Sequence, residues 1–294
     1  MERVLVAGAT GYLGRYVVKA LKQKGYYVKV LVRSQDKLNQ EGGFSSPSIY
    51  EFVDDIAIGD VTRSQSIKDV CLDVDFVFSS VGITNQKSNL TFMDVDFNGN
   101  LNLLREAERS KIRRFMYINV HGADECSSTL IKAKQRFVNE LKHSSIHHII
   151  INPTGYYSDM TELLTMARKG KVFLFGNGLN KMNPIHGADL ANVCVSAFSK
   201  ENSILEVGGP HVYTYHEMAE LALKVVNKKE KITTIPEWLV KISLPLLRII
   251  NKKQYNLFLF FFYMMTHDVV AKSSGNVDLK SYYESVMKKG YNNV

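Results

Sequence analysis

The feature that most constrains this sequence is a glycine turn near its N-terminus. Gly8, Gly11 and Gly14 follow the β-branched run Val4–Ala7 and precede the helical pattern Tyr16–Lys24. A strand, a glycine turn and a helix in this order are typical of the first unit of a dinucleotide-binding fold. Gly8 allows the tight turn, Gly11 lets the backbone approach a pyrophosphate, and Gly14 lets the helix pack on the sheet. The alternative is a structural turn without a ligand.

We expect the helix start to bind phosphates through exposed N–H groups and the positive end of its dipole. The predicted cofactor contacts of this turn are Gly8, Thr10, Gly11, Tyr12, Leu13 and Gly14. Where the second strand ends, Arg33 and Ser34 favour a 2′-phosphate and therefore NADP(H) over NAD(H), although Asp36 nearby leaves NAD(H) open. Later strand ends add Asp60 and Val61 near the adenine, and Ser80, Val81 and Gly82 near the nicotinamide ribose.

Short β-branched runs alternate with helical patterns in the first half of the chain. About six strands precede residue 155, as in successive βα units of a parallel sheet. We therefore expect an α/β fold, a Rossmann-type doubly wound parallel sheet. Residues 1–155 would form the dinucleotide-binding core, and residues 156–294 a smaller, mainly helical lobe on the substrate side, interleaved with the core in one structural unit. The helical patterns include Asn98–Glu108, Leu130–Lys142, Met160–Lys169, Gly187–Phe198, Tyr215–Lys224 and Pro236–Ile250.

Composition narrows the class of protein further. Cys71, Cys126 and Cys194 are far apart and odd in number, so we expect neither a disulfide framework nor a metal site. The N-terminus begins a strand at once and lacks signal-peptide features, which favours a cytoplasmic protein. The net charge of +8 alone would permit a nucleic-acid partner, but residues 224–253 hold eight basic and two acidic side chains. That segment lacks interleaved stacking aromatics, so we expect no nucleic-acid binding.

Several ordered motifs resemble the short-chain dehydrogenase/reductase superfamily, in particular its atypical and extended branch with NmrA-like, isoflavone-reductase-like and divinyl-chlorophyllide-reductase-like proteins. The resemblance implies a Rossmann-type sheet, NADP(H) and usually a reductase, dehydratase or epimerase reaction, although some members only sense the nucleotide. Pro153 and Thr154 lie within one motif and are expected to contact the cofactor. The motifs are GATGYLG at 8–14, LVRS at 31–34, GDVT at 59–62, the stretch 133–141, NPTGYYSDM at 152–160 and NPIHGADLA at 183–191.

One departure from the family pattern bears on the chemistry. The familiar catalytic pair is Tyr-x-x-x-Lys, in which the lysine lowers the pKa of the tyrosine and the tyrosine exchanges a proton with the substrate. Four residues before Lys134 stands Leu130, and four before Lys132 stands Ser128, so the tyrosine is missing. Ordinary alcohol–ketone exchange by that pair is not expected, and any chemistry needs another proton donor.

Lys134 is nevertheless the first catalytic candidate. It interrupts the apolar stripe of its helix, whereas Lys132 lies on the polar side. A lysine on a buried face is costly unless it binds something, such as ribose hydroxyls or a substrate oxygen. We expect it to orient the cofactor, with general acid as the bolder role and a lysine reaching solvent at the stripe's edge as the structural alternative. The other members of the stripe are Leu130, Phe137, Val138 and Leu141.

Five more side chains are candidates near the expected chemistry. Tyr156, the second catalytic candidate, and Tyr157 follow the sixth strand and could overhang the nicotinamide or merely pack. His121, after the fifth strand, is a possible proton donor. His186 and Asp189 match a family motif, but we favour a structural role for them, because an aspartate in a first helical turn is stabilised by the helix dipole.

The C-terminal segment Ile235–Thr266 should form helices that cover an apolar pocket or dock on a membrane surface. Pro245 should kink or break the first helix. The second stretch, Tyr255–Thr266, is apolar all round but shorter than the roughly 20 residues that span a bilayer. We expect its phenylalanines at 258, 260, 261 and 262 to be largely inside. A peripheral membrane contact beside the basic residues at 241, 248, 252 and 253 is the alternative.

Two functions fit these patterns. The first is an NADPH-dependent reductase of a hydrophobic small molecule, possible targets being a conjugated C=C or a carbonyl. The second is a non-catalytic NADP(H)-binding sensor or assembly factor with a protein or membrane partner.

Overall fold

The structure is a computed structural model that describes residues 1–83, 90–229 and 231–288. Within these residues the main sheet has seven strands. Neighbouring strands from β3 to β6 pair in parallel. The spatial order is β3 (Asp55–Ile58), β2 (Tyr27–Val32), β1 (Arg3–Ala7), β4 (Phe76–Ser79), β5 (Arg114–Ile118), β6 (His147–Pro153) and β9 (Ser203–Val207).

This strand order confirms the predicted Rossmann-type doubly wound sheet. The chain winds outward from β1 to β3 and then returns to place β4 on the other side of β1. Beside the carboxyl ends of β1 and β4 lies the switch point at which such folds bind nucleotides. The runs Val4–Ala7 and Phe76–Phe78 are almost completely buried, as strands covered on both faces require.

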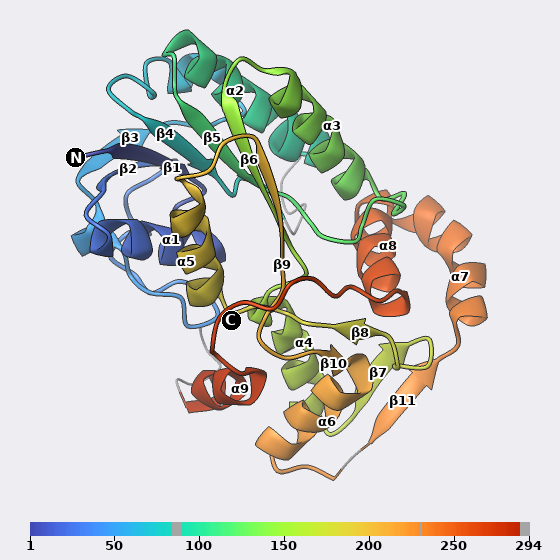
Figure 1. The fold of residues 1–294 in the computed structure, drawn as a ribbon. Coiled ribbons are helices and arrows are strands. Elements are labelled where there is room, and N and C mark those ends of the chain that lie inside the picture. The colour runs from blue at the N-terminus through green and yellow to red at the C-terminus, as the bar shows by residue number, and fades with distance from the viewer. Residues whose placement is uncertain (84–89, 230, 289–294) are drawn as a thin grey trace. The chain divides into compact units, whose positions relative to one another are not determined.

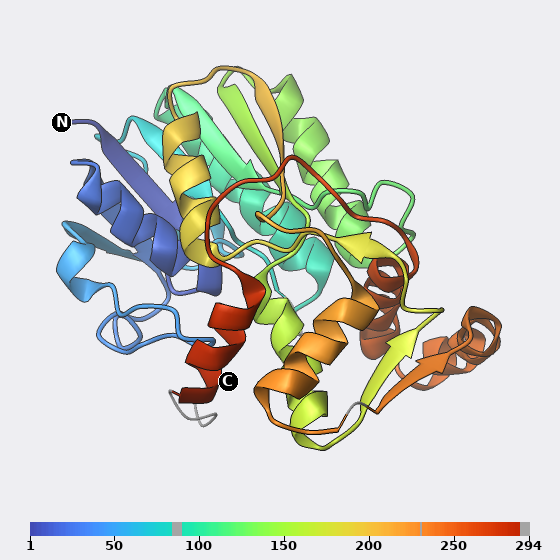
Figure 2. The same cartoon turned by 60° about the horizontal axis from the view of Figure 1, so that its bottom comes forward.

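Helices cover both faces of this sheet (Figure 1). On one face lie α1 (Tyr12–Gln23) and α5 (Gly187–Ala197), and on the other lie α2 (Asn100–Arg109) and α3 (Thr129–His143); Figure 2 shows the same layers from below. The apolar stripe of α1 explains its place, because Leu13, Val17 and Leu21 recur at i, i+4 and i+8 and are buried.

The chain divides into two compact units. The first unit holds most of the main sheet and consists of Met1–Asn119, Lys132–Asn152 and Leu190–Leu205. The second consists of Val120–Ile131, Pro153–Asp189 and Glu206–Val294. Neither unit is one continuous segment. Our division at residue 155 into a core and a substrate lobe remains a prediction.

The second unit is mainly helical and has its own apolar core. Helices α4, α6 and α9 pack on one another, and α7 makes its main contacts with α8. Large buried side chains of this core include Tyr157, Leu164 and Tyr283. The elements are α4 (Tyr157–Arg168), β7 (Val172–Phe175), β8 (Lys181–Met182), β10 (Tyr213–Thr214), α6 (Tyr215–Val225), β11 (Ile232–Ile235), α7 (Glu237–Ile250), α8 (Lys252–Thr266) and α9 (Leu279–Lys288).

The C-terminal helices differ from the expectation in two ways. Pro245 lies inside α7 and does not end it, so the expected break is wrong, whereas the expected kink remains a prediction. The phenylalanines of α8 are not uniformly inside either: Phe262 is buried, Phe258 and Phe260 are partly buried, and Phe261 is 40% exposed. Phe258 and Phe262 pack against Phe175 of β7, whereas the aromatic contact of Phe261 is with its neighbour Phe260.

In the part of the chain that the structure describes, no helix combines the length and apolar character needed to cross a membrane. Among the same residues there is also no group of three or more His, Cys, Asp or Glu side chains placed to hold a metal ion.

Candidate nucleotide-binding site

The glycine turn has the geometry that the sequence predicts. Gly8 has a φ of +84°, which favours glycine, and its carbonyl accepts a hydrogen bond from the Gly11 amide at 3.0 Å. A Cβ on Gly14 would lie 2.1 Å from the Gly8 oxygen, and a Cβ on Gly8 would lie 2.7 Å from Ser80 Oγ. The turn is therefore too tight for any larger residue at these two positions.

The start of α1 can receive an anion. Within the described residues its first turn has no side-chain cap and no acidic residue, and Gly11 at the N-cap is exposed. The first N–H groups of such a helix and the positive end of its dipole suit a phosphate. Thr10 and Tyr12 are partly exposed beside it, whereas the Leu13 side chain is buried. The turn thus fits a pyrophosphate, with Leu13 offering only its backbone.

Arg15 holds the neighbouring loop in place. It is only 2% exposed. Its guanidinium donates to three backbone carbonyls of this loop, those of Lys37 at 2.6 Å, Gln40 at 2.6 Å and Pro47 at 2.9 Å. The sequence did not predict this role, and its one signal was an arginine directly after the last glycine of the turn. This arginine fixes the loop that follows β2 before any ligand arrives.

The predicted 2′-phosphate site lies on the first unit's surface at the end of β2. Arg33 and Ser34 are both exposed. Ser34 Oγ donates to Asp36 Oδ2 at 2.5 Å, so this hydroxyl already has a partner. Burial would raise the pKa of Asp60, but hydrogen bonds from Thr62 and the charge of Arg33 lower it below its usual value. Selectivity for NADP(H) would therefore depend on Arg33 more than on Ser34.

The loops after β3 and β4 are tied to α2 by two asparagine side chains. Asn102 Nδ2 donates to the Val61 oxygen at 2.9 Å, and Asn100 Nδ2 donates to the Val81 oxygen at 3.1 Å. Ser80 donates its amide to the Ala7 oxygen at 3.1 Å. These contacts fasten the loops of the predicted adenine side and the predicted nicotinamide side of the site to the same helix, α2.

A buried carboxylate that the sequence did not predict, Asp96, lies beside Gly82. Asp96 is on a π-helix, Met93–Gly99, which precedes α2 where the sequence predicted the start of an α-helix at Asn98. Its Oδ2 accepts the Ile83 amide at 3.2 Å. Its Oδ1 has no hydrogen-bond partner among the described residues, and a Cβ on Gly82 would lie 2.5 Å from it. A short π-helix often marks a functional site.

Lys134 reaches into this buried cluster. Its Nζ lies 3.7 Å from Asp96 Oδ1 and donates to Tyr117 Oη at 3.3 Å and to the Ile118 oxygen at 3.2 Å. Its side chain is 13% exposed, whereas Lys132 is exposed, as the apolar stripe predicts. We call Lys134, Asp96 and Tyr117 the lysine cluster.

Burial and charge oppose each other in the lysine cluster. Burial raises the pKa of Asp96 to about 6, although Lys134 and the Ile83 amide work against this shift. Burial lowers the pKa of Lys134, and the Asp96 carboxylate works against that shift. Near neutral pH, Asp96 is therefore mostly ionised and can hold a charged Lys134.

Tyr117 brings a tyrosine hydroxyl to the lysine by a different route from Tyr-x-x-x-Lys. It lies on β5 rather than one turn earlier on the helix, and it is completely buried. A search for the motif within one helix could not find this pairing. Asp96 left no clear signal either, because a second carboxylate, Asp94, stands two residues before it in the sequence.

The other predicted residues lie in the second unit, and most have protein partners. Thr154 is buried, and its hydroxyl donates to the Asn183 oxygen at 2.6 Å. Pro153 is also buried, and its oxygen accepts the His121 amide at 3.0 Å. Tyr156 is partly exposed and starts α4, with its amide donating to Asp159 Oδ2 at 3.2 Å. The cofactor contacts of Pro153 and Thr154 and the catalytic role of Tyr156 remain predictions.

Three candidates have structural contacts. The Tyr157 hydroxyl donates to the Val277 oxygen at 2.7 Å. Asp189 Oδ2 accepts backbone amides from residues 276 and 277. His121 Nδ1 contacts Glu206 Oε2, and its Nε2 lies 3.1 Å from the Val270 oxygen, so both ring nitrogens face acceptors.

His186 also has a structural environment. Its Nδ1 accepts the Ala188 amide at 3.2 Å, and its ring lies edge-on to Tyr157 and Tyr282. Burial lowers its pKa, with Asp189 opposing the shift. These contacts favour the structural reading of His186.

A family model described as NAD(P)H-binding matches residues 8–201, which include the glycine turn and the lysine cluster. The chain belongs to this NAD(P)H-binding family. Its relatives agree with the atypical short-chain dehydrogenase/reductase group that the motifs predict, and with an NAD(P)H cofactor.

Three curated relatives illustrate the range of the family. The chain is 26% identical over 257 residues to the mitochondrial NADH-ubiquinone oxidoreductase 40 kDa subunit of Neurospora crassa, covering 84% of this chain and 65% of that protein. It is 26% identical over 249 residues to the chloroplastic divinyl chlorophyllide a 8-vinyl-reductase of Arabidopsis thaliana, covering 79% and 60%. It is 24% identical over 245 residues to the photosystem II assembly factor Ycf39 of Trieres chinensis, covering 81% and 74%. The chain thus spans less than two-thirds of the first two relatives.

A solved structure with a similar fold is an NADPH-dependent quinone oxidoreductase from Escherichia coli in complex with NADPH. The TM-score is 0.74 at 15% identity, over 97% of this chain and 99% of that one. At this identity the similarity concerns the fold alone.

Proposed function

We propose that this protein is an NADPH-dependent reductase of a hydrophobic small molecule that contains a C=C conjugated to a carbonyl. The observation that carries the proposal is the lysine cluster. It places an interior ammonium at the end of β5, beside the loop that follows β4. Burying a cation with a single carboxylate partner costs desolvation free energy. A hydrogen bond from the ammonium to a nucleotide or substrate oxygen would offset that cost.

The residues of the chain would position the reactants and balance the charge. NADPH, when bound, supplies a hydride. Lys134 would donate hydrogen bonds to ribose hydroxyls or to the substrate carbonyl, and Asp96 and Tyr117 would hold its ammonium in place. When a hydride adds to the β-carbon, the carbonyl oxygen gains negative charge that a lysine ammonium stabilises, and a proton then reaches the α-carbon from water or a protein acid. Tyr156 is our candidate for that acid.

This route fits a site without Tyr-x-x-x-Lys. In alcohol–ketone exchange the oxygen itself must exchange a proton with a tyrosine of lowered pKa. In reduction of a conjugated C=C the hydride goes to carbon, and the oxygen needs only stabilisation. The vinyl-reductase name of one relative supports this choice.

The preference for NADPH would come from Arg33. An exposed guanidinium at the end of β2 suits a 2′-phosphate, which it can contact through two N–H groups. The Asp36 carboxylate, which accepts from Ser34, would repel a 2′-phosphate, so we expect the preference for NADPH over NADH to be moderate.

A second candidate function is a non-catalytic NADP(H)-binding sensor or assembly factor with a protein or membrane partner. The observation that favours it is the apolar surface of α7, whose large side chains face solvent. The name of the Trieres chinensis relative points in the same direction.

Deuterium transfer distinguishes the two functions. NADPH deuterated at both C4 positions would be incubated with the wild type and a panel of conjugated enones and vinyl-substituted tetrapyrroles. The reductase proposal expects deuterium at the β-carbon of at least one product, detected by mass spectrometry. It also expects a loss of about 100-fold in rate for Lys134→Met, with little change for the exposed control Lys132→Met. Tight NADPH binding without transfer to any compound would favour the assembly factor.

A further inference from the structure

Helix α7 carries large apolar side chains on two sides. On its inner side Val240 is buried, and Leu244 and Leu247 are partly buried. On the other side, large apolar side chains keep between 44% and 83% of their surface exposed. We call them the outer face of α7. They are Trp238, Leu239, Ile242, Leu246, Ile249 and Ile250.

The outer face is one continuous patch. A helix turns by about 100° per residue, so its six side chains fall within an arc of about 120°, away from the arc of Val240 and Leu244. Single exposed apolar side chains are common on protein surfaces, whereas a contiguous row of them marks a binding surface. Packing within the second unit buries the inner side of α7 and leaves the outer face exposed and available to a binding partner.

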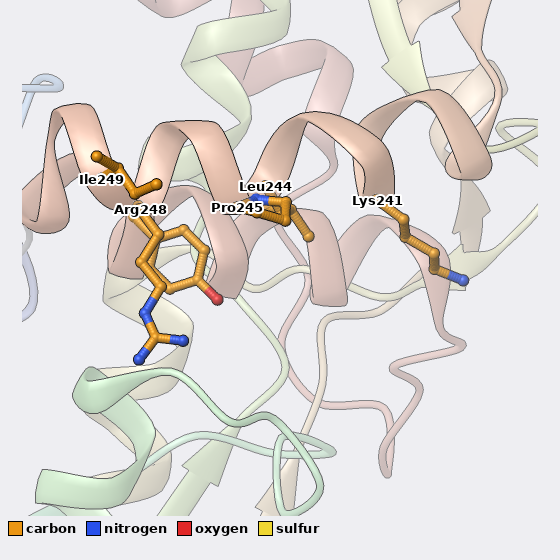
Figure 3. Close-up of a pocket in the computed structure, with 6 residues that line it drawn as sticks. Lys241, Leu244, Pro245, Arg248 and Ile249 are labelled. Carbon is orange, nitrogen blue, oxygen red and sulfur yellow. The ribbon is translucent and has the colours of Figure 1, made fainter.

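Basic side chains border the outer face. Lys241 and Arg248 project from the same side of α7, about two turns apart (Figure 3). The only acidic residue of α7, Glu237, accepts from Lys241 at 3.0 Å. The surrounding segment 224–253 has eight basic and two acidic residues. Between the two cations lies an open hollow lined by Lys241, Leu244, Pro245, Arg248, Ile249 and Tyr255.

We propose that the outer face of α7 docks onto an anionic phospholipid surface, with the helix lying in the plane of the membrane. Aliphatic side chains on one face and lysine or arginine at its border are the composition of interfacial helices. The basic border complements phospholipid phosphates. The 14 residues of α7 extend about 21 Å, too short to cross the apolar core of a bilayer.

A lipid surface fits the outer face better than a protein partner does. Protein interfaces combine apolar anchors with many matched hydrogen bonds. The outer face has only the indole N–H of Trp238 as a side-chain donor, and its other five members are Leu or Ile. Trp at one end of an aliphatic row is typical of a side chain at headgroup level. This inference rests on α7 and not on the proposed reductase activity.

The sole tryptophan of the chain gives a direct readout. Trp238 is on the outer face, so the intrinsic tryptophan fluorescence of the full chain reports on this surface alone. We expect a blue shift on mixing with vesicles of phosphatidylcholine and phosphatidylglycerol, and quenching when the acyl chains are brominated. Phosphatidylcholine alone should give a weaker effect, and high salt should reduce the effect on anionic vesicles.

Paired variants separate the apolar and the basic contributions. Ile242→Ser with Ile249→Ser should weaken vesicle partitioning by at least about tenfold, because two exposed aliphatic anchors are lost. Lys241→Gln with Arg248→Gln should weaken it by about tenfold on anionic vesicles only. The charge control is Lys132→Gln with Lys280→Gln, two exposed lysines outside α7, and should bind like the wild type.

NADPH titration of the same variants serves as the folding control and keeps this inference separate from the proposed function. Unchanged NADPH affinity with lost vesicle binding supports lipid docking. Vesicle binding that persists in the apolar pair would overturn it. So would a wild type that shows no fluorescence change with vesicles but forms a concentration-dependent dimer through α7, because the occupant would then be a second copy of the chain.

Discussion

The glycine turn of the first unit and helix α7 of the second differ in how tightly they are packed. Gly14 leaves no room for a side chain, since a Cβ there would lie 2.1 Å from the Gly8 oxygen, and the Arg15 guanidinium donates to four backbone carbonyls. On α7, large apolar side chains do not pack within the fold, since Ile249 is 83% exposed and Ile242 is 70% exposed. The turn is determined by packing, and the outer face of α7 is not.

This difference separates a site that is preorganised by packing from a surface that is exposed for a partner. Tight packing and internal hydrogen bonds preorganise the nucleotide site before its ligand arrives. An exposed apolar arc contributes little to folding, and its side chains are free to meet a partner. Substitutions should therefore affect stability at the turn, chemistry at the lysine cluster, and neither at the outer face.

The largest effect on stability is expected for Gly14→Ala. Its Cβ would overlap the Gly8 backbone, which cannot move without opening the turn, so the free energy of unfolding should fall by about 3 kcal/mol. Gly25→Ala is the matched control. Gly25 has a φ of +84° but nothing within 4 Å of its Cβ position, and should lose only about 1 kcal/mol. Urea unfolding of both variants measures the difference, and equal losses would show that the turn is not tightly packed.

The next effect is a pH dependence set by Asp96. As pH falls through about 6, this carboxylate takes up a proton and no longer holds the Lys134 charge, so NADPH binding and turnover should fall by up to about tenfold per pH unit. Because the pKa is raised from 3.8 on folding, the folded state binds this proton more tightly. Stability attributable to Asp96 should therefore rise as pH falls from about 6 toward 4, opposite in direction to activity.

The variant Asp96→Asn isolates this carboxyl. It keeps the shape but has no proton to gain, so its activity should be low at neutral pH and should lack the step near pH 6. Rate profiles and unfolding curves of both proteins between pH 5 and about 8 give the comparison. A wild-type step that persists in Asp96→Asn would assign it to another group.

A smaller effect on nucleotide affinity is expected at the predicted 2′-phosphate site. Arg33→Ala should weaken NADPH binding by about tenfold and leave NADH binding unchanged, because an exposed charge contact to a 2′-phosphate is partly screened by solvent. Arg63→Ala removes another exposed arginine near Asp60 and serves as the control. Fluorescence titration with both nucleotides decides the matter. Parallel losses for NADPH and NADH would remove the case for a 2′-phosphate site.

The smallest effect should be seen on the outer face of α7. Ile242→Ala should change the free energy of unfolding by less than about 0.5 kcal/mol, since the side chain is 70% exposed. Val240→Ala on the inner side, where the side chain is 4% exposed, should cost about 1–2 kcal/mol. Thermal unfolding of the two variants compares the two sides of the same helix. A large loss for Ile242→Ala would mean that the outer face packs within the protein.

The sequence predicted the parts of this protein that follow local rules. The glycine turn, the six parallel strands from β1 to β6 and the inward position of Lys134 each follow from spacing and periodicity over a few residues. Asp96 and Tyr117 could not be predicted in this way. They meet Lys134 across 38 and 17 residues of chain, on elements whose distance is set by tertiary packing.

The C-terminal helices show the opposite limit. Their composition fits a buried helix and a membrane-facing helix equally well, because both require apolar side chains. Only the packing of α7 on one side revealed that its outer face remains exposed.

The most direct test of the account is the NADPH affinity of two variants of the lysine cluster and of one control variant. Lys134→Met should weaken binding by about 100-fold, or about 2.7 kcal/mol, whereas the exposed Lys132→Met should stay within about twofold of the wild type. The double variant Lys134→Met with Asp96→Asn removes the unpaired buried carboxylate, so it should regain stability without regaining affinity. Wild-type affinity in the folded double variant would contradict the claim that Lys134 serves the nucleotide.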